Sequence, residues 1–183
     1  QLYEQTKLSV VSRIKQAYYR RAYAFAAVDV LDRNLELLSY FLNKACLSGK
    51  IERVIELLAR APPEAVEDNR FWRFKGWVHA AQRQYGLAED AYRHALQLNP
   101  YDWHSQHELA DLMRRLKKPD QVEVLQALAL EGKELRKAIM QLPNVQDIPT
   151  PILRRMAAYA GMCGDTVVAD SLSQRIATMR GGW

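Results

Sequence analysis

The chain has 183 residues, of which 49% are apolar and 26% are charged, and its formal net charge is +5. This balance is typical of a globular domain with a buried core and excludes a disordered chain. No apolar run approaches the roughly 18 residues that a membrane helix needs, so we expect no membrane span.

The N-terminus does not indicate a compartment. The chain begins at Gln1 rather than Met and has no basic segment followed by an apolar one. We therefore expect either a processed protein or a piece of a longer one, and the compartment, cytoplasmic or periplasmic, stays open. The two cysteines, Cys46 and Cys163, are too few for a disulfide framework and are interpreted as small buried side chains.

The first part of the chain predicts a long amphipathic helix, because no Gly or Pro interrupts residues 2–48. From Val10 to Leu42, apolar residues recur at alternating steps of four and three, with Arg21 as the one charged position of this heptad seam. We treat residues 1–33 as a segment of its own. It either caps the end of the helices that follow or forms a coiled coil with a second copy or a partner, so that residues 10–42 would join a homo-oligomer.

Helical periodicity dominates the chain after residue 33, and sustained period-two alternation is absent. The breaks are short and regularly placed. They fall at Ser48-Gly49, Ala61-Pro62-Pro63, Gly86, Asn99-Pro100, Pro119-Asp120, Pro143 to Pro151 and Gly164-Asp165. Helices of about 12 to 16 residues joined by short turns are the pattern of an all-α array of helical hairpins.

Small and apolar residues recur in this region with a period of 34. The three series are Leu42, Gly76 and Ala110; Val54, Ala88 and Val122; and Ala61, Ala95 and Ala129. Residues 69–102 also carry a longer pattern, formed by Trp72, Gly76, Ala88, Tyr92, Ala95 and Pro100. Small residues at 76 and 88 allow two helices to cross closely, and the aromatic rings fill the gaps beside them.

This pattern resembles the tetratricopeptide repeat, W-x2-L-G-x2-Y followed by A-x3-F and a closing Pro, with Lys75 and His79 as departures. The resemblance covers about three quarters of the chain, from near Asn34 to Met179. It implies a right-handed α-solenoid of antiparallel helix pairs over residues 34–183. The expected units are about 35–68, 69–102, 103–140 and 150–180, with an irregular insertion at about 141–149.

The same resemblance implies a concave groove lined by the first helix of each pair. The partner-binding residues expected there are Asn43, Arg70, Arg73, Trp77, His104, His107, Asp111, Arg114 and Arg154. The set joins a cationic lobe to an aromatic side chain, so an acidic or C-terminal peptide with an apolar anchor would suit it. Some members of the family clamp a terminal carboxylate with Lys and Asn, but only Asn43 is in place here.

Other chemistries have weaker signals. His104 and His107 stand at the i, i+3 spacing of a metal pair, but no third ligand follows at a set distance, so we expect no metal and no cofactor. Nucleophile elbows, phosphate loops and zinc-protease helices are absent from the sequence, so we expect no enzyme. Three short basic patches lack the recurring code of RNA-binding repeats and are interpreted as solvated faces.

The predicted function is therefore that of a non-catalytic scaffold, which binds a peptide or a partner helix in its groove. Two alternatives stay open. One is a self-assembling structural module joined through residues 10–42, and the other is an RNA-binding helical repeat.

Overall fold

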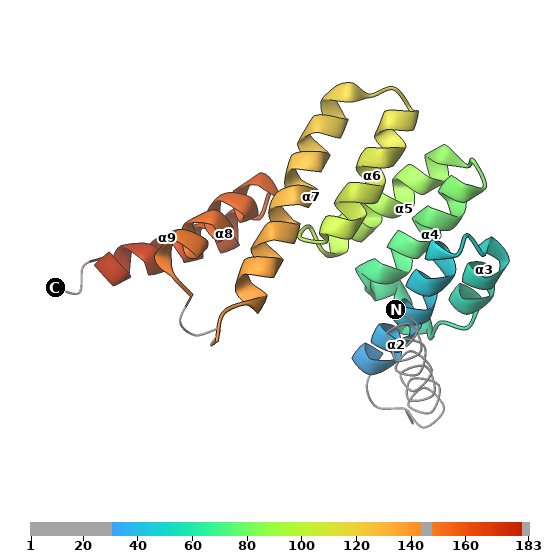
Figure 1. The fold of residues 1–183 in the computed structure, drawn as a ribbon, viewed down its shortest axis with the longest axis horizontal. Coiled ribbons are helices and arrows are strands. Elements are labelled where there is room, and N and C mark those ends of the chain that lie inside the picture. Colours follow the sequence, from blue (N-terminus) through green and yellow to red (C-terminus); the bar gives the residue numbers. More distant parts are fainter. Residues whose placement is uncertain (1–30, 144–147, 181–183) are drawn as a thin grey trace, which may run out of the picture. The chain divides into compact units, whose positions relative to one another are not determined.

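The computed structural model describes residues 31–143 and 148–180, which form eight α-helices and one short 3-10 helix, with no strand among them (Figure 1). The predicted all-α class is confirmed. Residues 1–30 lie outside the described part of the chain, and with them most of the predicted N-terminal helix and seam. Self-association through residues 10–42 and the segment boundary at residue 33 therefore stay predictions. None of the described helices is both long and apolar enough to cross a membrane.

The chain divides into two compact units between Val66 and Glu67. The elements of the first are α2 (Leu31–Leu47), α3 (Ile51–Ala59) and most of the 3-10 helix η1 (Pro63–Glu67). α2 packs against α3 as an antiparallel hairpin. Both helices bury one stripe at helical spacing, Leu38 and Leu42 on α2 and Val54 and Leu57 on α3, because these apolar side chains leave water when the hairpin closes.

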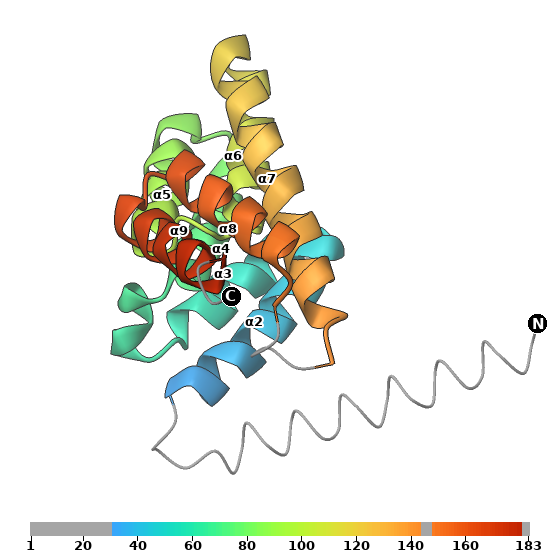
Figure 2. The ribbon, with the colours of Figure 1, turned by 90° about the vertical axis from the view of Figure 1, so that its left-hand side faces the viewer.

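The second unit consists of three further hairpins. Its described helices are α4 (Asn69–Ala81), α5 (Tyr85–Leu98), α6 (Trp103–Arg115), α7 (Pro119–Met140), α8 (Thr150–Met162) and α9 (Thr166–Arg180). Each helix packs most closely against its hairpin partner, and α5 contacts α6 as α7 contacts α8. α4 also contacts α6, the first helix of the next hairpin. The last hairpin, in which α8 and α9 lie side by side, is seen in Figure 2.

One turn geometry ends the first helix of each of the four hairpins in the described part of the chain. The residue in the left-handed region is Gly49 (φ 64°), Arg83 (φ 61°), Lys117 (φ 57°) or Gly164 (φ 83°). The residue after it always donates its backbone N–H to the carbonyl five residues back, as Gln84 does to His79 at 2.8 Å. This is the backbone closure of a Schellman cap. The turns are 34, 34 and 47 residues apart, so the repeat seen in the sequence is also a repeat of backbone conformation.

Small residues allow the close helix crossing in the α4–α5 hairpin. Gly76 is buried against the ring of Tyr92, and a methyl group added at Gly76 would come within 2.7 Å of that ring. Ala88 and Ala95 on α5 are fully buried. Tyr92 also belongs to a core cluster with Leu109, Leu112 and Met113 of α6. The α4–α5 hairpin and α6 therefore share one hydrophobic core.

The two departures from the tetratricopeptide pattern have local partners. The Lys75 ammonium lies 4.5 Å from the ring centroid of Trp72, so a cation–π contact stands where the pattern has a leucine. His79 Nδ1 lies 2.7 Å from Gln84 Oε1, on the other side of the turn.

The extra residues of the third unit lengthen α7 and the loop after it. α7 has 22 residues, whereas α5 has 14. Pro143 and Pro149 then interrupt the helical pattern, and α8 begins at Thr150. Ile148, just before α8, is buried in a small cluster with Leu153 of α8 and Ile176 of α9, so this residue is held against the last hairpin.

Candidate partner-binding face

The predicted groove residues of the second unit lie on first helices. α4 carries Arg70, Arg73 and Trp77, α6 carries His104, His107, Asp111 and Arg114, and α8 carries Arg154. α4 contacts α6, and we use the name α4–α6 face for the side that these residues of the two helices were predicted to line. Asn43 is exposed on α2, in the first unit.

Arg70 is held at the start of α4 by its own helix cap. The Asp68 carboxylate accepts the Arg70 backbone N–H at 2.8 Å, which caps the helix. The Arg70 guanidinium also donates to both Asp68 oxygens, at 2.9 and 2.7 Å. Burial raises the pKa of Asp68, but the hydrogen bonds and charge of Arg70 outweigh it and hold the pKa below its usual value. The carboxyl is therefore ionised and neutralises Arg70.

Arg73 lies in the interior instead of facing a groove. Only 7% of it is exposed, and its Nη1 lies 3.5 Å from Asp102 Oδ1. Asp102 is equally buried and caps α6 through the His104 N–H. Its other oxygen, Oδ2, accepts from Asn69 at 2.9 Å and from Ser105 at 2.6 Å. A buried charge needs such partners, so Arg73 ties α4 to α6 and has little surface to offer a ligand.

Three exposed side chains follow one another along α6. His107 Nε2 lies 3.8 Å from Asp111 Oδ2, and Asp111 Oδ1 accepts from Arg114 Nη1 at 2.5 Å. These pairs stand at i, i+4 and i, i+3, the spacings that meet on a helix surface. Trp77 on α4 is half-buried. The α4–α6 face therefore offers one aromatic side chain on α4 and, on α6, a polar row in which acid and base alternate.

His104 differs from His107. Its ring stacks on the indole of Trp103 with 3.6 Å between centroids. Partial desolvation of the imidazole, together with the nearby charge of Arg73, lowers the pKa of His104 to about 4. The imidazole is therefore neutral near pH 7. In residues 31–143 and 148–180, no three metal-ligating side chains from His, Cys, Asp or Glu gather at one point.

Glu108 is a residue of this face that the sequence interpretation missed. It lies half-buried on α6 and accepts a hydrogen bond from the Tyr92 hydroxyl of α5. Burial raises the pKa of its carboxyl, and the neighbouring Asp111 adds to the rise. The 34-residue register could have indicated its burial, because the equivalent position in α4 is Phe74, which is 3% exposed.

A second polar network, also missed, joins the start of α6 to the last hairpin. Gln106, which occupies the register position of Trp72, is fully buried. Its Nε2 donates to the Pro100 carbonyl at 2.7 Å, and its Oε1 accepts from the Tyr159 hydroxyl at 3.2 Å. Cys163 is half-buried nearby with a free thiol, and burial raises its pKa, so its reactive thiolate form is disfavoured.

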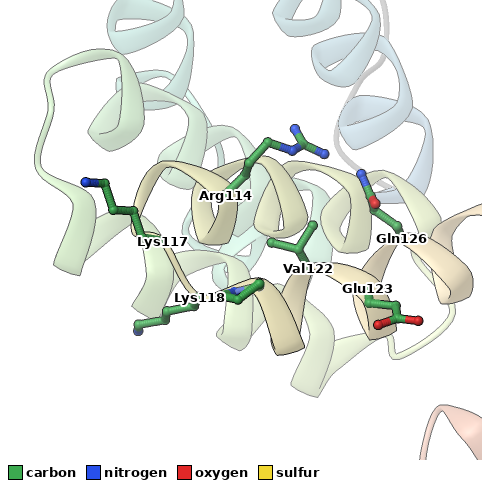
Figure 3. Close-up of a pocket in the computed structure, with 7 residues that line it drawn as sticks. Arg114, Lys117, Lys118, Val122, Glu123 and Gln126 are labelled. Carbon is green, nitrogen blue, oxygen red and sulfur yellow. The ribbon is translucent and has the colours of Figure 1, made fainter.

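Basic residues gather at the turn between α6 and α7, where a pocket of about 390 Å³ lies. Figure 3 shows Val122 in the middle of the lining residues, with Arg114 and Gln126 above it. Two of the cations already have a carboxylate: Arg114 pairs with Asp111, and Lys118 Nζ lies 3.0 Å from Glu89. This pairing weakens the electrostatic attraction that RNA or another polyanion would need.

Carboxylates of the same chain therefore neutralise most of the predicted cationic lobe. Arg70, Arg73 and Arg114 each have their own carboxylate. Arg154 on α8 is exposed, and no described carboxylate pairs with it. Comparison with known protein families and with characterised proteins finds no match to this chain.

Proposed function

We propose that this chain is a helical-repeat protein of the tetratricopeptide type, folded as a right-handed α-solenoid, and that it holds a segment of another protein on the α4–α6 face without catalysing a reaction. The recurrence of the left-handed turn supports the repeat part of this proposal. Gly49, Arg83 and Lys117 stand 34 residues apart with the same backbone closure, and 34 is the length of a tetratricopeptide unit.

The composition of the face favours a peptide with an apolar anchor. Trp77 is half-buried, so it has a rigid aromatic surface to offer and is already held by its neighbours. Aromatic side chains of this kind supply much of the binding energy in protein interfaces. His107, Asp111 and Arg114 on α6 provide donors and acceptors for a polar backbone or side chain. Because most arginines of the face are paired with carboxylates of the same chain, we expect an apolar anchor in the partner to matter more for binding than acidic residues.

Site-specific photo-crosslinking would test this function. A photoreactive amino acid would replace Trp77 or His107 on the face, and Asp90 or Gln97 on the exposed side of α5 as matched controls. We expect one protein species to be crosslinked from both face positions and from neither control. In the otherwise unmodified chain, Trp77→Ala should lower recovery of that species more than tenfold, as truncation of an aromatic anchor does.

The proposal fails if the control positions capture the same species as the face. It also fails if Trp77→Ala leaves recovery unchanged while circular dichroism shows the helices intact.

A further inference from the structure

A concave region of the second unit lies where the repeat becomes irregular. It is a cleft of about 420 Å³ between α7, α8 and α9, closed at one end by the start of α6. Its inner wall is buried and apolar, and its mouth is exposed. Leu135, Tyr159 and Ala160 form part of the wall, and Arg136, Met140 and Val168 lie at the mouth. We call this region the α7–α9 cleft.

The cleft depends on the inserted residues. α5 ends at Leu98, and the position 34 residues later is Gly132. Everything in α7 after Gly132 therefore has no counterpart in α5, and this extra length supplies Leu135, Arg136 and Met140. Insertions in repeat proteins tend to lie where binding surfaces are built. The volume falls in the range of small-ligand pockets rather than of packing voids.

The exposed apolar groups at the mouth indicate an apolar occupant. Met140 is 73% exposed and Val168 is 38% exposed. Val168 belongs to α9, which packs on α8, whereas Met140 ends α7. Covering such groups removes apolar area from water, which favours binding by about 25 cal/mol per Å².

One charged group of the cleft is left without a counter-charge. Asp102 lines the cleft but is engaged by Arg73, Asn69 and Ser105. Arg136 is exposed at the mouth, and no described carboxylate pairs with it. A single guanidinium beside an apolar wall complements a monoanion, and its planar fork matches a carboxylate best.

We propose that the α7–α9 cleft binds a small apolar carboxylate, with the hydrocarbon body against Leu135, Tyr159 and Ala160 and the carboxylate on Arg136. The cleft shares none of its lining residues with the predicted residues of the α4–α6 face. This proposal can therefore be tested independently of the proposed protein partner. A ligand there would contact α7 and α9 together and would fix the last hairpin against the third.

Calorimetric titration of the full chain with decanoate and with decanol would test the proposal. The two probes share an apolar body and differ in the carboxylate. We expect decanoate to bind about tenfold more tightly than decanol at low salt, with the difference shrinking as salt rises. Arg136→Gln should weaken decanoate about tenfold and leave decanol unchanged, because it removes one charge-assisted contact. Lys137→Gln, one residue along α7 and outside the lining, is the matched control.

A second pair of variants tests the place of binding. Val168→Trp should fill the mouth and abolish binding of both probes, whereas Val167→Trp, at a more exposed position outside the lining, should not. Met140→Trp replaces Val168→Trp if that variant does not fold. Equal affinity for decanoate and decanol, equal effects of Arg136→Gln and Lys137→Gln, or no saturable binding at millimolar ligand would each overturn the proposal.

Discussion

Arg73 of α4 and Asp102 at the start of α6 form an ion pair in the interior of the second unit, with 3.5 Å between Nη1 and Oδ1. The carboxylate of this pair has three tasks: it neutralises Arg73, caps α6 and accepts hydrogen bonds from Asn69 and Ser105. The pair therefore fixes the second hairpin of the chain against the third.

We expect Asp102→Ala to lower the free energy of unfolding by about 3 kcal/mol, because Arg73 would be left buried without a counter-charge and α6 without its cap. Asp111→Ala removes an exposed carboxylate on the same helix and should cost less than about 1 kcal/mol. Urea titration followed by circular dichroism measures both. Equal costs would show that the Arg73–Asp102 pair is not a structural link.

Two glycines of the α4–α5 hairpin should respond in opposite directions to the same substitution. Gly76→Ala pushes a methyl group into the ring of the fully buried Tyr92 and should cost about 1–3 kcal/mol. Gly86→Ala meets no neighbouring atom within 4 Å and should stabilise α5 by about 0.5 kcal/mol. Thermal unfolding of the two variants checks the pair. If Gly76→Ala were as stable as the parent, the close crossing of α4 and α5 would be wrong.

Arg83 has a left-handed backbone in the turn where Gly49 and Gly164 stand in other hairpins. A side chain in that region costs about 1 kcal/mol, so Arg83→Gly should raise the stability of the protein by about that amount. Gln82→Gly, one residue earlier at φ −82°, should instead lower it by about 0.5 kcal/mol, because glycine there only adds freedom to the unfolded chain. Chemical denaturation of both variants distinguishes these effects; a gain from both would refute the turn geometry.

Glu108 should make the stability depend on pH. Its pKa is raised in the folded protein by burial, so the folded state holds the proton more tightly than the unfolded chain does. Stability from this group is fully present below its ordinary pKa and is lost as the pH rises through the raised one. Glu108→Gln should therefore be more stable than the parent at pH 7 and equal to it below pH 4. The exposed Glu123→Gln is the control, and a gain that persists in acid would contradict the assignment.

Much of the fold could be predicted because its signals are local. Breaks such as Ser48-Gly49 and Gly164-Asp165 mark turns that the structure contains. Of the nine residues in the 34-residue series, seven are buried, and Ala61 and Val122 are partly buried. The length of α7 is also a local matter, since no Gly or Pro stops the helix between Gly132 and Pro143.

The candidate site was harder to predict because exposure depends on tertiary partners. Periodicity put Arg73 on the groove side of α4, and only the packing of α4 on α6 shows that it meets Asp102 and is buried. The α7–α9 cleft lay beyond prediction for a similar reason. The shape of the cleft depends on the angle between helices, and sequence periodicity predicts each helix but not the angle between two of them. In addition, no local feature of the sequence distinguishes Arg136, which lines the cleft, from Lys137, which does not.

The turn that ends each first helix is closed by hydrogen bonds from within its own six residues. The end of a helix is therefore decided locally, whatever the length of chain that precedes it. The third and fourth turns have the same closure although 47 residues separate them instead of 34. A protein built in this way can gain residues between hairpins one at a time, without copying a whole unit and without shifting the phase of the helices downstream. New surface can then arise at the junctions while the hairpins themselves keep their geometry.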